Sequence, residues 1–509
     1  MASIRYRAFT LLGSLPILPL AREHQGGYLP LLRKVIYVYR YHGLDGIAER
    51  VEFLRRLQFM PAPGPTVLSQ GHGPGRTLAA ALDDRYDYRA PERTADVSHT
   101  IASFARTPLI SIVMPVYNVQ PYWLRAAVGS VTKQWYTNWE LCICDDGSTD
   151  AGTIAEIQRL EASGDHRIKV VRSAYNNNIS AASNMALRLA SGEFIALLDH
   201  DDELTADALY EVVRVLQDEA VDFVYSDEDK IETDGTFVEP HFKPSFAPDL
   251  FLCQNYISHL SVLRRELVLE VGCWEQGLEG AQDYDLYLKV LERTQGVRHV
   301  PKVLYHWRKV PGSTAMEFSS KSTAHDAGRE SLTQAIRRRH VDATVTDGAT
   351  PGTYRVRYGI EGDPLVSIVV LVRDAARDLD VCLDSVLASE HDNMEVVVVT
   401  GENALPRAVR NAYATTDAPV RFCTSSDHDN PSRALNAAVQ KLCRGDYLVF
   451  LDADLEVSTR DWIASMLEHA QRASVGAVGA RLLYSNGNIH NAGIVLTPRT
   501  TGTAFHAHQ

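Results

Sequence analysis

Two groups of acidic residues each follow a short apolar segment of the chain. Asp199, Asp201 and Asp202 follow the run FIALL, and Asp145 with Asp146 ends the earlier run WELCIC. Short apolar runs predict buried strands, so both groups stand where a strand leaves the interior. Carboxylates do not bind a polyphosphate directly, so a divalent cation between them and the phosphates, or sugar and base donor groups, would account for the pattern. That combination describes a nucleotide sugar with Mg²⁺ or Mn²⁺.

The second acidic group also has a purely structural interpretation. Asp202, Glu203 or Thr205 would cap the helix that the sequence predicts over 206–217 and would complement the positive end of its dipole. Both interpretations of this group stay open from the residues alone.

Strands and helices alternate from about Pro108 onward. The apolar patterns predict strands over 108–118, 139–146, 168–173 and 194–199 and helices over 121–134, 152–163, 180–191 and 206–217. This alternation predicts an α/β fold with a mostly parallel, Rossmann-like sheet. Ligands of such sheets bind beyond the carboxyl ends of the strands, so the two acidic groups would converge on one crevice.

Composition limits the classes of protein. A chain of 509 residues, 45% of them hydrophobic, has room for two or three domains with proper cores. The net charge of -13 argues against a general nucleic-acid-binding protein. The seven cysteines include no CxxC pair, which fits a reducing cytoplasm. A dinucleotide enzyme is disfavoured as well, because PVYN and not GxGxxG follows the first strand.

The N-terminal part of the chain differs from the rest. Residues 1–60 carry more Lys and Arg than Asp and Glu, and their apolar run AFTLLGSLPILPLA is too short to span a bilayer. We expect a helical region here, either packed on the main domain or in peripheral contact with an anionic membrane. Residues 61–106, rich in Pro and Gly, predict a linker.

An ordered set of motifs over about residues 106–320 resembles the family 2 glycosyltransferases, which have the GT-A fold. The motifs are PVYN at 115–118, DDGSTD at 145–150, Asn176 to Ser180, Asn184, Gly192-Glu193, DHDD at 199–202, YSDED at 225–229 and GAQDYD at 280–285. Each motif is weak alone, but the ordered set is specific.

The resemblance implies a role for each matching residue. Pro115 and Tyr117 would shape the nucleotide pocket, which would also include Asn118, Asn184 and His200. Asp146, with Asp145 beside it, would accept hydrogen bonds from the pyrimidine base, unless it only closes an Asx turn. Asp199 would hold the ribose or the sugar. Asp201 would ligate the cation that bridges the diphosphate, and His306 would be a further metal or diphosphate ligand, unless it is a packed structural residue.

Asp283 is the predicted catalytic base. Inverting transfer needs a carboxylate that removes the proton of the acceptor hydroxyl as it attacks the anomeric carbon. Asp283 begins an amphipathic helix at the family's position for this base. The alternative is that Asp283 only caps this helix, and Asp285 is a second candidate for either role.

The chain then repeats its own pattern. PLVSIVVLV, MEVVVVTG and GDYLVFLDAD correspond to PLISIVMPV, WELCICDD and GEFIALLDHD at an offset of about 255 residues. In this second copy Thr400 and Gly401 replace Asp145 and Asp146, although Asp452 and Asp454 remain. We expect no equivalent of Asp283, and we expect the copy to dock on the first domain or on another copy of the chain.

The sequence therefore predicts a GT-A glycosyltransferase domain over 107–345 and a second, degenerate and incomplete GT-A-like domain over 360–509. The resemblance implies an inverting, metal-dependent transferase that moves sugar from a nucleoside-diphosphate sugar to a saccharide or glycolipid acceptor in surface polysaccharide (O-antigen-like) synthesis. It would act in the cytoplasm or at the inner face of the cytoplasmic membrane. The competing hypothesis is a catalytically silent nucleotide-sugar-binding subunit.

Overall fold

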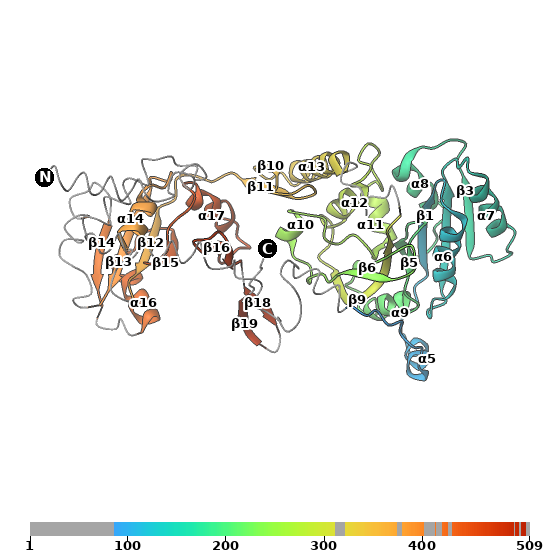
Figure 1. Cartoon of the computed structure of the whole chain (residues 1–509), viewed down its shortest axis with the longest axis horizontal. Coiled ribbons are helices and arrows are strands. Elements are labelled where there is room, and N and C mark those ends of the chain that lie inside the picture. Colours follow the sequence, from blue (N-terminus) through green and yellow to red (C-terminus); the bar gives the residue numbers. More distant parts are fainter. Residues whose placement is uncertain are drawn as a thin grey trace, which may run out of the picture. The chain divides into compact units, whose positions relative to one another are not determined.

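The computed structural model describes residues 86–310, 321–373, 379–401, 413, 420–425, 430–492, 494–497 and 500–504 (Figure 1). The helical region expected over 1–60 and most of the expected linker lie outside these residues. Among the residues that are described, no helix combines the length and the apolar character that crossing a membrane requires.

The first half of the chain forms a mixed nine-stranded sheet. Its order is β3-β2-β1-β4-β8-β6-β9-β5, with β7 paired to β6. The strands are β1 (Ile110–Val116), β2 (Trp139–Asp145), β3 (Ile168–Arg172), β4 (Phe194–Leu197), β5 (Glu203–Leu204), β6 (Phe223–Ile231), β7 (Phe237–His241), β8 (Ser261–Arg264) and β9 (Val297–Arg308). Strands β1 to β4 are parallel, as expected, whereas β8 runs antiparallel to both β4 and β6.

Helices cover both faces of this sheet because its strands are apolar on both sides. Ile110, Ile112 and Met114 of β1 belong to one core and Val113 belongs to the other, as the alternation of side chains along a strand requires. The first core includes residues of α6 (Pro121–Thr132), α7 (Ala151–Glu161) and α9 (Ala208–Val215). The second includes residues of α8 (Asn178–Leu187), α11 (Arg265–Glu270), α12 (Gln282–Val290) and α13 (Lys321–Arg338). Among the described residues, the other helices of this half are α5 (Ala95–Ala102) and α10 (Pro248–Phe251).

Segments on either side of the predicted domain also pack on the first sheet. Tyr86 donates a hydrogen bond to Asp229 of β6 at 2.6 Å. The ring of Tyr88 lies 4.7 Å from that of Phe237. After α13, the hairpin β10 (Ala343–Asp347) and β11 (Tyr354–Tyr358) contributes Tyr354 and Val356 to the second core. The first half therefore draws on residues outside 107–345.

The second half of the chain forms a four-stranded parallel sheet, β14-β13-β12-β15. Its strands are β12 (Val366–Leu371), β13 (Met394–Thr400), β14 (Val420–Thr424) and β15 (Tyr447–Asp452). The helices described in this half are α14 (Leu379–Leu387), α16 (Pro431–Leu442) and α17 (Trp462–Ala470). This order reproduces β3-β2-β1-β4. Two separate hairpins follow, β16 (Leu482–Leu483) with β17 (Ile489–Asn491), and β18 (Ile494–Thr497) with β19 (Thr500–Ala504).

Both sheets contain the same buried polar network. In the first, Ser111 donates to Glu140 at 2.6 Å and accepts the N–H of Gly192 at 2.8 Å. In the second, Ser367 donates to Glu395 and Gly445 donates to Ser367, at the same two distances. Glycine is required at both places, because a Cβ atom would lie 2.4 Å from the Leu109 carbonyl oxygen in one case and 2.6 Å from the Ser367 nitrogen in the other.

The two sheets differ at the strand that follows this glycine. In the first sheet β8 pairs with β4 and helps to bury Ile195 completely. In the described part of the second sheet, β15 pairs only with β12. Leu448 and Phe450 of β15 are consequently 42% and 56% exposed.

Candidate active site

The parallel register brings the loops after β1, β2 and β4 to one edge of the first sheet. Val116 pairs with Asp145, so the loops that follow these two residues begin side by side. Asn118, in the loop after β1, links this loop to the loop after β2, because its side-chain oxygen accepts the N–H groups of Thr149 and Asp150 at 2.8 and 2.9 Å. The backbone of Asn118 is in the left-handed region, with a φ of 45°. Tyr117 is left 41% exposed at this edge.

Asp145 and Asp146 are both buried and both hold backbone in place. Asp145 accepts the N–H of Ser148 at 3.0 Å, which closes a turn. Asp146 accepts the N–H of Asn177 at 3.0 Å and thereby fixes the loop after β3 to the loop after β2. Their predicted contact with a base stays a prediction.

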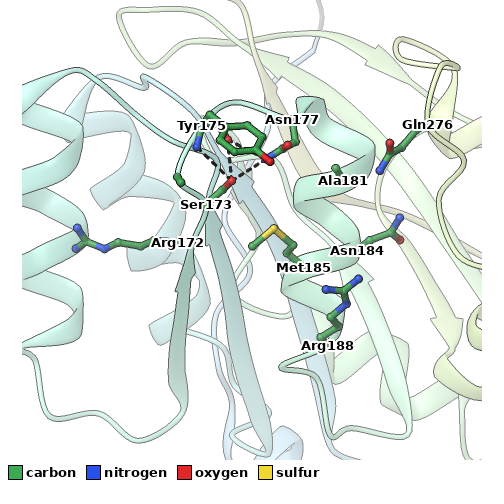
Figure 2. Close-up of a pocket in the computed structure, with 10 residues that line it drawn as sticks. Arg172, Ser173, Tyr175, Asn177, Ala181, Asn184, Met185, Arg188 and Gln276 are labelled. Carbon is green, nitrogen blue, oxygen red and sulfur yellow. Dashed lines mark hydrogen bonds between the residues drawn. The ribbon is translucent and has the colours of Figure 1, made fainter.

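Asn184 does not line the main cleft, although its hydrogen-bond partner Trp274 does. Its side chain bonds both the carbonyl oxygen and the N–H of Trp274, at 2.8 and 3.1 Å. It lines a separate pocket of about 420 Å³ between the end of β3 and α8, which Figure 2 shows together with Tyr175 and Arg188. None of the residues that line this pocket lines the main cleft.

The main cleft has a volume of about 550 Å³ and lies beyond the carboxyl ends of β1 and β4. Pro115 and Asp199 line it from the sheet edge, His259 and Trp307 come from the segments around β8 and β9, and Asp283 comes from α12. The structure thus brings three predicted residues together, namely Pro115, Asp199 and Asp283.

Asp199, Asp202 and His259 each offer a ligand atom, and these three atoms lie within 4.8 Å of one another. Asp202 is held firmly, since it accepts the hydroxyl of Tyr305 at 2.5 Å and the N–H of Arg308 at 2.7 Å. Asp199 is more open, with 41% of its side chain exposed. Nε2 of His259 lies 3.8 Å from a carboxylate oxygen of Asp199.

On the same loop, the side chain of His200 and the backbone of Asp201 make other contacts. Nδ1 of His200 lies 3.1 Å from the carbonyl oxygen of Pro115. The carbonyl oxygen of Asp201 accepts Nε of Arg308 at 2.7 Å, and Arg308 also pairs with Glu203. The carboxylate of Asp201 is not in the group of three.

The strand β9 pairs His306 with Glu203 at the end of this loop, but the side chain of His306 faces away from the acidic group. Tyr305 and His306 are successive residues of β9, so their side chains point to opposite faces of the sheet. Tyr305 reaches Asp202, whereas Nδ1 of His306 lies 2.5 Å from Asp229 and its ring packs on Tyr88 and Phe237. The geometry matches the packed structural role that the sequence left open for His306.

Asp283 stands in the first turn of α12, and Ala281 occupies the N-cap position. Asn255 donates to its carboxylate at 2.8 Å, and burial raises the pKa of Asp283. A raised pKa suits a carboxylate that must accept a proton near neutral pH. Asp285 points elsewhere: its side chain is completely buried and pairs with Lys289 at 2.7 Å.

His259 is a residue that the sequence prediction missed. Its ring stacks on Tyr305 with centroids 4.6 Å apart, and its Nδ1 lies 3.2 Å from Glu228. Although burial opposes it, the Glu228 carboxylate raises the pKa of His259 to about 9. The signal that could have pointed here is the acidic run SDED of β6, because buried carboxylates need cationic partners.

The donor set of the cleft fits a divalent cation. Burial, followed by the neighbouring carboxylates, raises the pKa of Asp202, so negative charge is poorly compensated there. Carboxylate oxygens and an imidazole nitrogen are both common ligands of divalent metal ions. A metal-binding imidazole usually donates its other N–H to a carboxylate, and Glu228 stands in that position for His259.

Comparison with known proteins gives matches to both halves of the chain. The family model described as Glycosyl transferase family 2 matches residues 111–272 and 367–502. The uncharacterized protein y4gI of Sinorhizobium fredii is 40% identical over 419 residues, which cover 81% of this chain and 46% of that protein. The O-antigen biosynthesis protein RfbC of Myxococcus xanthus is 34% identical over 420 residues, which cover 82% of this chain and 32% of that protein. The chain therefore spans less than half the length of either relative.

Solved structures match over a shorter part. The crystal structure of S. aureus TarS 1–349 with UDP-GlcNAc is 20% identical, with a TM-score of 0.38 over 45% of this chain and 66% of that one.

Proposed function

This chain belongs to glycosyl transferase family 2, and from that membership we propose that its first half is an inverting, metal-dependent transferase that uses a nucleoside-diphosphate sugar. The acceptor is a saccharide or glycolipid, and the product enters a surface polysaccharide of the O-antigen type. The name of the relative RfbC supports this biosynthetic role. The two sheets are the cores of tandem GT-A domains, catalytic over 107–345 and degenerate over 360–509.

One observation carries the proposal: the base candidate Asp283 and Asp199 of the acidic group line the same cleft. A carboxylate that activates the acceptor and a site that holds the departing diphosphate must face one reacting carbon from opposite sides. Asp283 comes from α12 and Asp199 from the end of β4, so they approach the cleft from different elements.

The residues divide the work as follows. Asp199, Asp202 and His259, whose ligand atoms lie together, would hold the cation, with Asp201 of the same loop as a further ligand. When bound, the cation offsets the charge that develops on the diphosphate as it leaves. Asp283 takes the proton of the acceptor hydroxyl while that oxygen bonds to the anomeric carbon, and the bond from this carbon to the diphosphate oxygen breaks with its electron pair. Pro115 and Tyr117 bound the donor pocket at the sheet edge.

The proposal is tested by Asp283→Asn in the full chain. We expect transfer to a glycolipid acceptor to fall on the order of 10²- to 10⁴-fold, because the proton acceptor is lost. Donor affinity, measured by calorimetry, should stay nearly unchanged, because Asp283 acts on the incoming hydroxyl. A collapse of donor affinity would assign Asp283 to the donor site. Absence of turnover in the unmodified protein with every donor and acceptor pair would favour the silent binding subunit.

A further inference from the structure

Lys243 has one of the most deeply buried side chains of the first half, with no exposed surface. Its ammonium group donates to Glu228 at 3.3 Å, to the carbonyl oxygen of Ile257 at 2.6 Å, and to the carbonyl oxygen of His259. An ammonium group has three N–H donors, so all of them are used within the protein. Lys243 therefore organises its neighbours and has no donor left for a ligand.

Glu228 is the centre of these contacts. It is 4% exposed and lies on β6. One oxygen accepts the backbone N–H of His259 at 3.0 Å and faces Nδ1 of the same residue at 3.2 Å. The other oxygen faces Nδ1 of His241 at 3.3 Å. Although burial favours its neutral form, Lys243 and the two histidines hold the pKa of Glu228 well below its usual range.

These contacts fix the His259 ring in two ways. The ring lies parallel to Tyr305, with an interplanar angle of 14°, so its plane is set. Glu228 holds the Nδ1 edge, which turns Nε2 toward Asp199 and the cleft. A neutral imidazole that donates its Nδ1 proton to a carboxylate has its lone pair on Nε2, and a divalent cation that binds there displaces the Nε2 proton of the charged ring.

We propose that Lys243 and Glu228 are positioning residues that orient His259 so that Nε2 presents its lone pair to a divalent cation beside Asp199. The inference rests on the proposed function, because it concerns the cation of the same cleft. Lys243 stabilises the buried Glu228 carboxylate, which would strongly destabilise the fold without a cationic partner.

The test is the double variant Glu228→Gln/Lys243→Met in the full chain. Removing both charges avoids leaving one of them buried alone, so the fold should persist, as checked by circular dichroism. We expect the Kd for Mn²⁺, measured by electron paramagnetic resonance without donor, to rise about 10- to 100-fold. Transfer activity should recover at saturating Mn²⁺.

The chain offers a matched control in Asp285→Asn/Lys289→Met. This pair is also buried, with its charged atoms 2.7 Å apart, and neither residue lines the cleft. Its removal should destabilise the protein comparably and leave the Kd for Mn²⁺ unchanged.

The outcomes separate the two proposals. If the unmodified protein binds no Mn²⁺, metal dependence fails and this inference fails with it. If the unmodified protein and the Glu228→Gln/Lys243→Met variant bind Mn²⁺ equally, the positioning role is overturned while the proposed function stands. Equal weakening in the control variant would also overturn it, because the effect would then be one of general stability. Should the double variant not fold, Glu228→Gln alone applies the same criterion.

Discussion

Asp199 and Asp202, two of the three aspartates of the loop after β4, differ in environment because they differ in partners. Asp202 is tied to Tyr305 and to the backbone of Arg308, whereas Asp199 stays open to the cleft. The sequence could predict that this loop is acidic and lies at a strand end. It could not predict the division of roles, because the partners belong to β9, more than 100 residues later in the chain.

At the same scale, Asp201→Asn should lower transfer by on the order of 10²-fold or more, because a charged ligand for the cation is lost. The fold should persist, and EDTA should inactivate the unmodified protein. Initial rates over a Mn²⁺ titration measure both effects. Asp234→Asn, an equal change in the exposed turn between β6 and β7, should have no effect. Full activity of Asp201→Asn in EDTA would end the metal mechanism.

At the scale of elements, the strands made of apolar runs could be predicted from the sequence, whereas β6 could not. The first four strands are apolar runs in the sequence, and the structure pairs them in parallel, as predicted. Strand β6, by contrast, buries Asp227, Glu228 and Asp229. It can do so because each carboxylate meets a basic group, His299, Lys243 and His306 respectively. Those partners come from distant segments, so periodicity along the sequence does not reveal the strand.

Glu140 of β2 gives a prediction about acid stability. Although burial opposes it, Lys169, Ser111 and Ser191 lower the pKa of Glu140 to about 2. Because the pKa of Glu140 is lower in the folded than in the unfolded state, the ionised carboxylate stabilises the fold fully above pH ~4.5. This contribution to the free energy of unfolding is lost as the pH falls toward 2. Glu140→Gln should lower the free energy of unfolding by about 1 to 3 kcal/mol at pH 7. It should also make the free energy of unfolding depend less on pH in this range.

Urea midpoints measured between pH 7 and pH 3 check this prediction. Glu161→Gln is the control, because Glu161 pairs with Arg172 at the surface and such pairs contribute ~0 to 1 kcal/mol. If Glu140→Gln loses stability with acid as steeply as the unmodified protein does, another group controls the acid transition.

At the scale of the whole molecule, the two sheets share a frame and differ in chemistry. The buried Ser-Glu-Gly network is present in both, but Thr400 is buried where Asp145 stands in the first sheet, and Asp452 pairs with Arg373 at 3.3 Å. The repeat could be predicted from the sequence because matching strands recur in order. The exposure of Leu448 and Phe450 on β15 could not be predicted from the sequence, because it depends on which strand lies beside β15.

Asp454→Ala should therefore leave transfer unchanged, whereas Asp201→Ala, its counterpart in the first copy, should abolish it. Rates for the two full-length variants, each checked for folding, make the comparison direct. Deleting residues 360–509 should mainly lower solubility or acceptor handling. Loss of chemistry in a folded Asp454→Ala protein would show that the second copy is catalytic.

The packing of Tyr86 and Tyr88 on the first sheet has a consequence for synthesis of the chain. Asp229, the partner of Tyr86, is made 143 residues later, and His306, against which Tyr88 packs, is made later still. At a synthesis rate of about 5–20 residues per second, roughly 7 to 30 s pass between the synthesis of Tyr86 and that of Asp229. During this interval two tyrosines that are half-buried in the finished protein stay uncovered on the ribosome, open to chaperones and proteases. The segment that contains Tyr86 and Tyr88 is the earliest described segment to be synthesised, and it can pack only after β6 and β9 of the first sheet have been made.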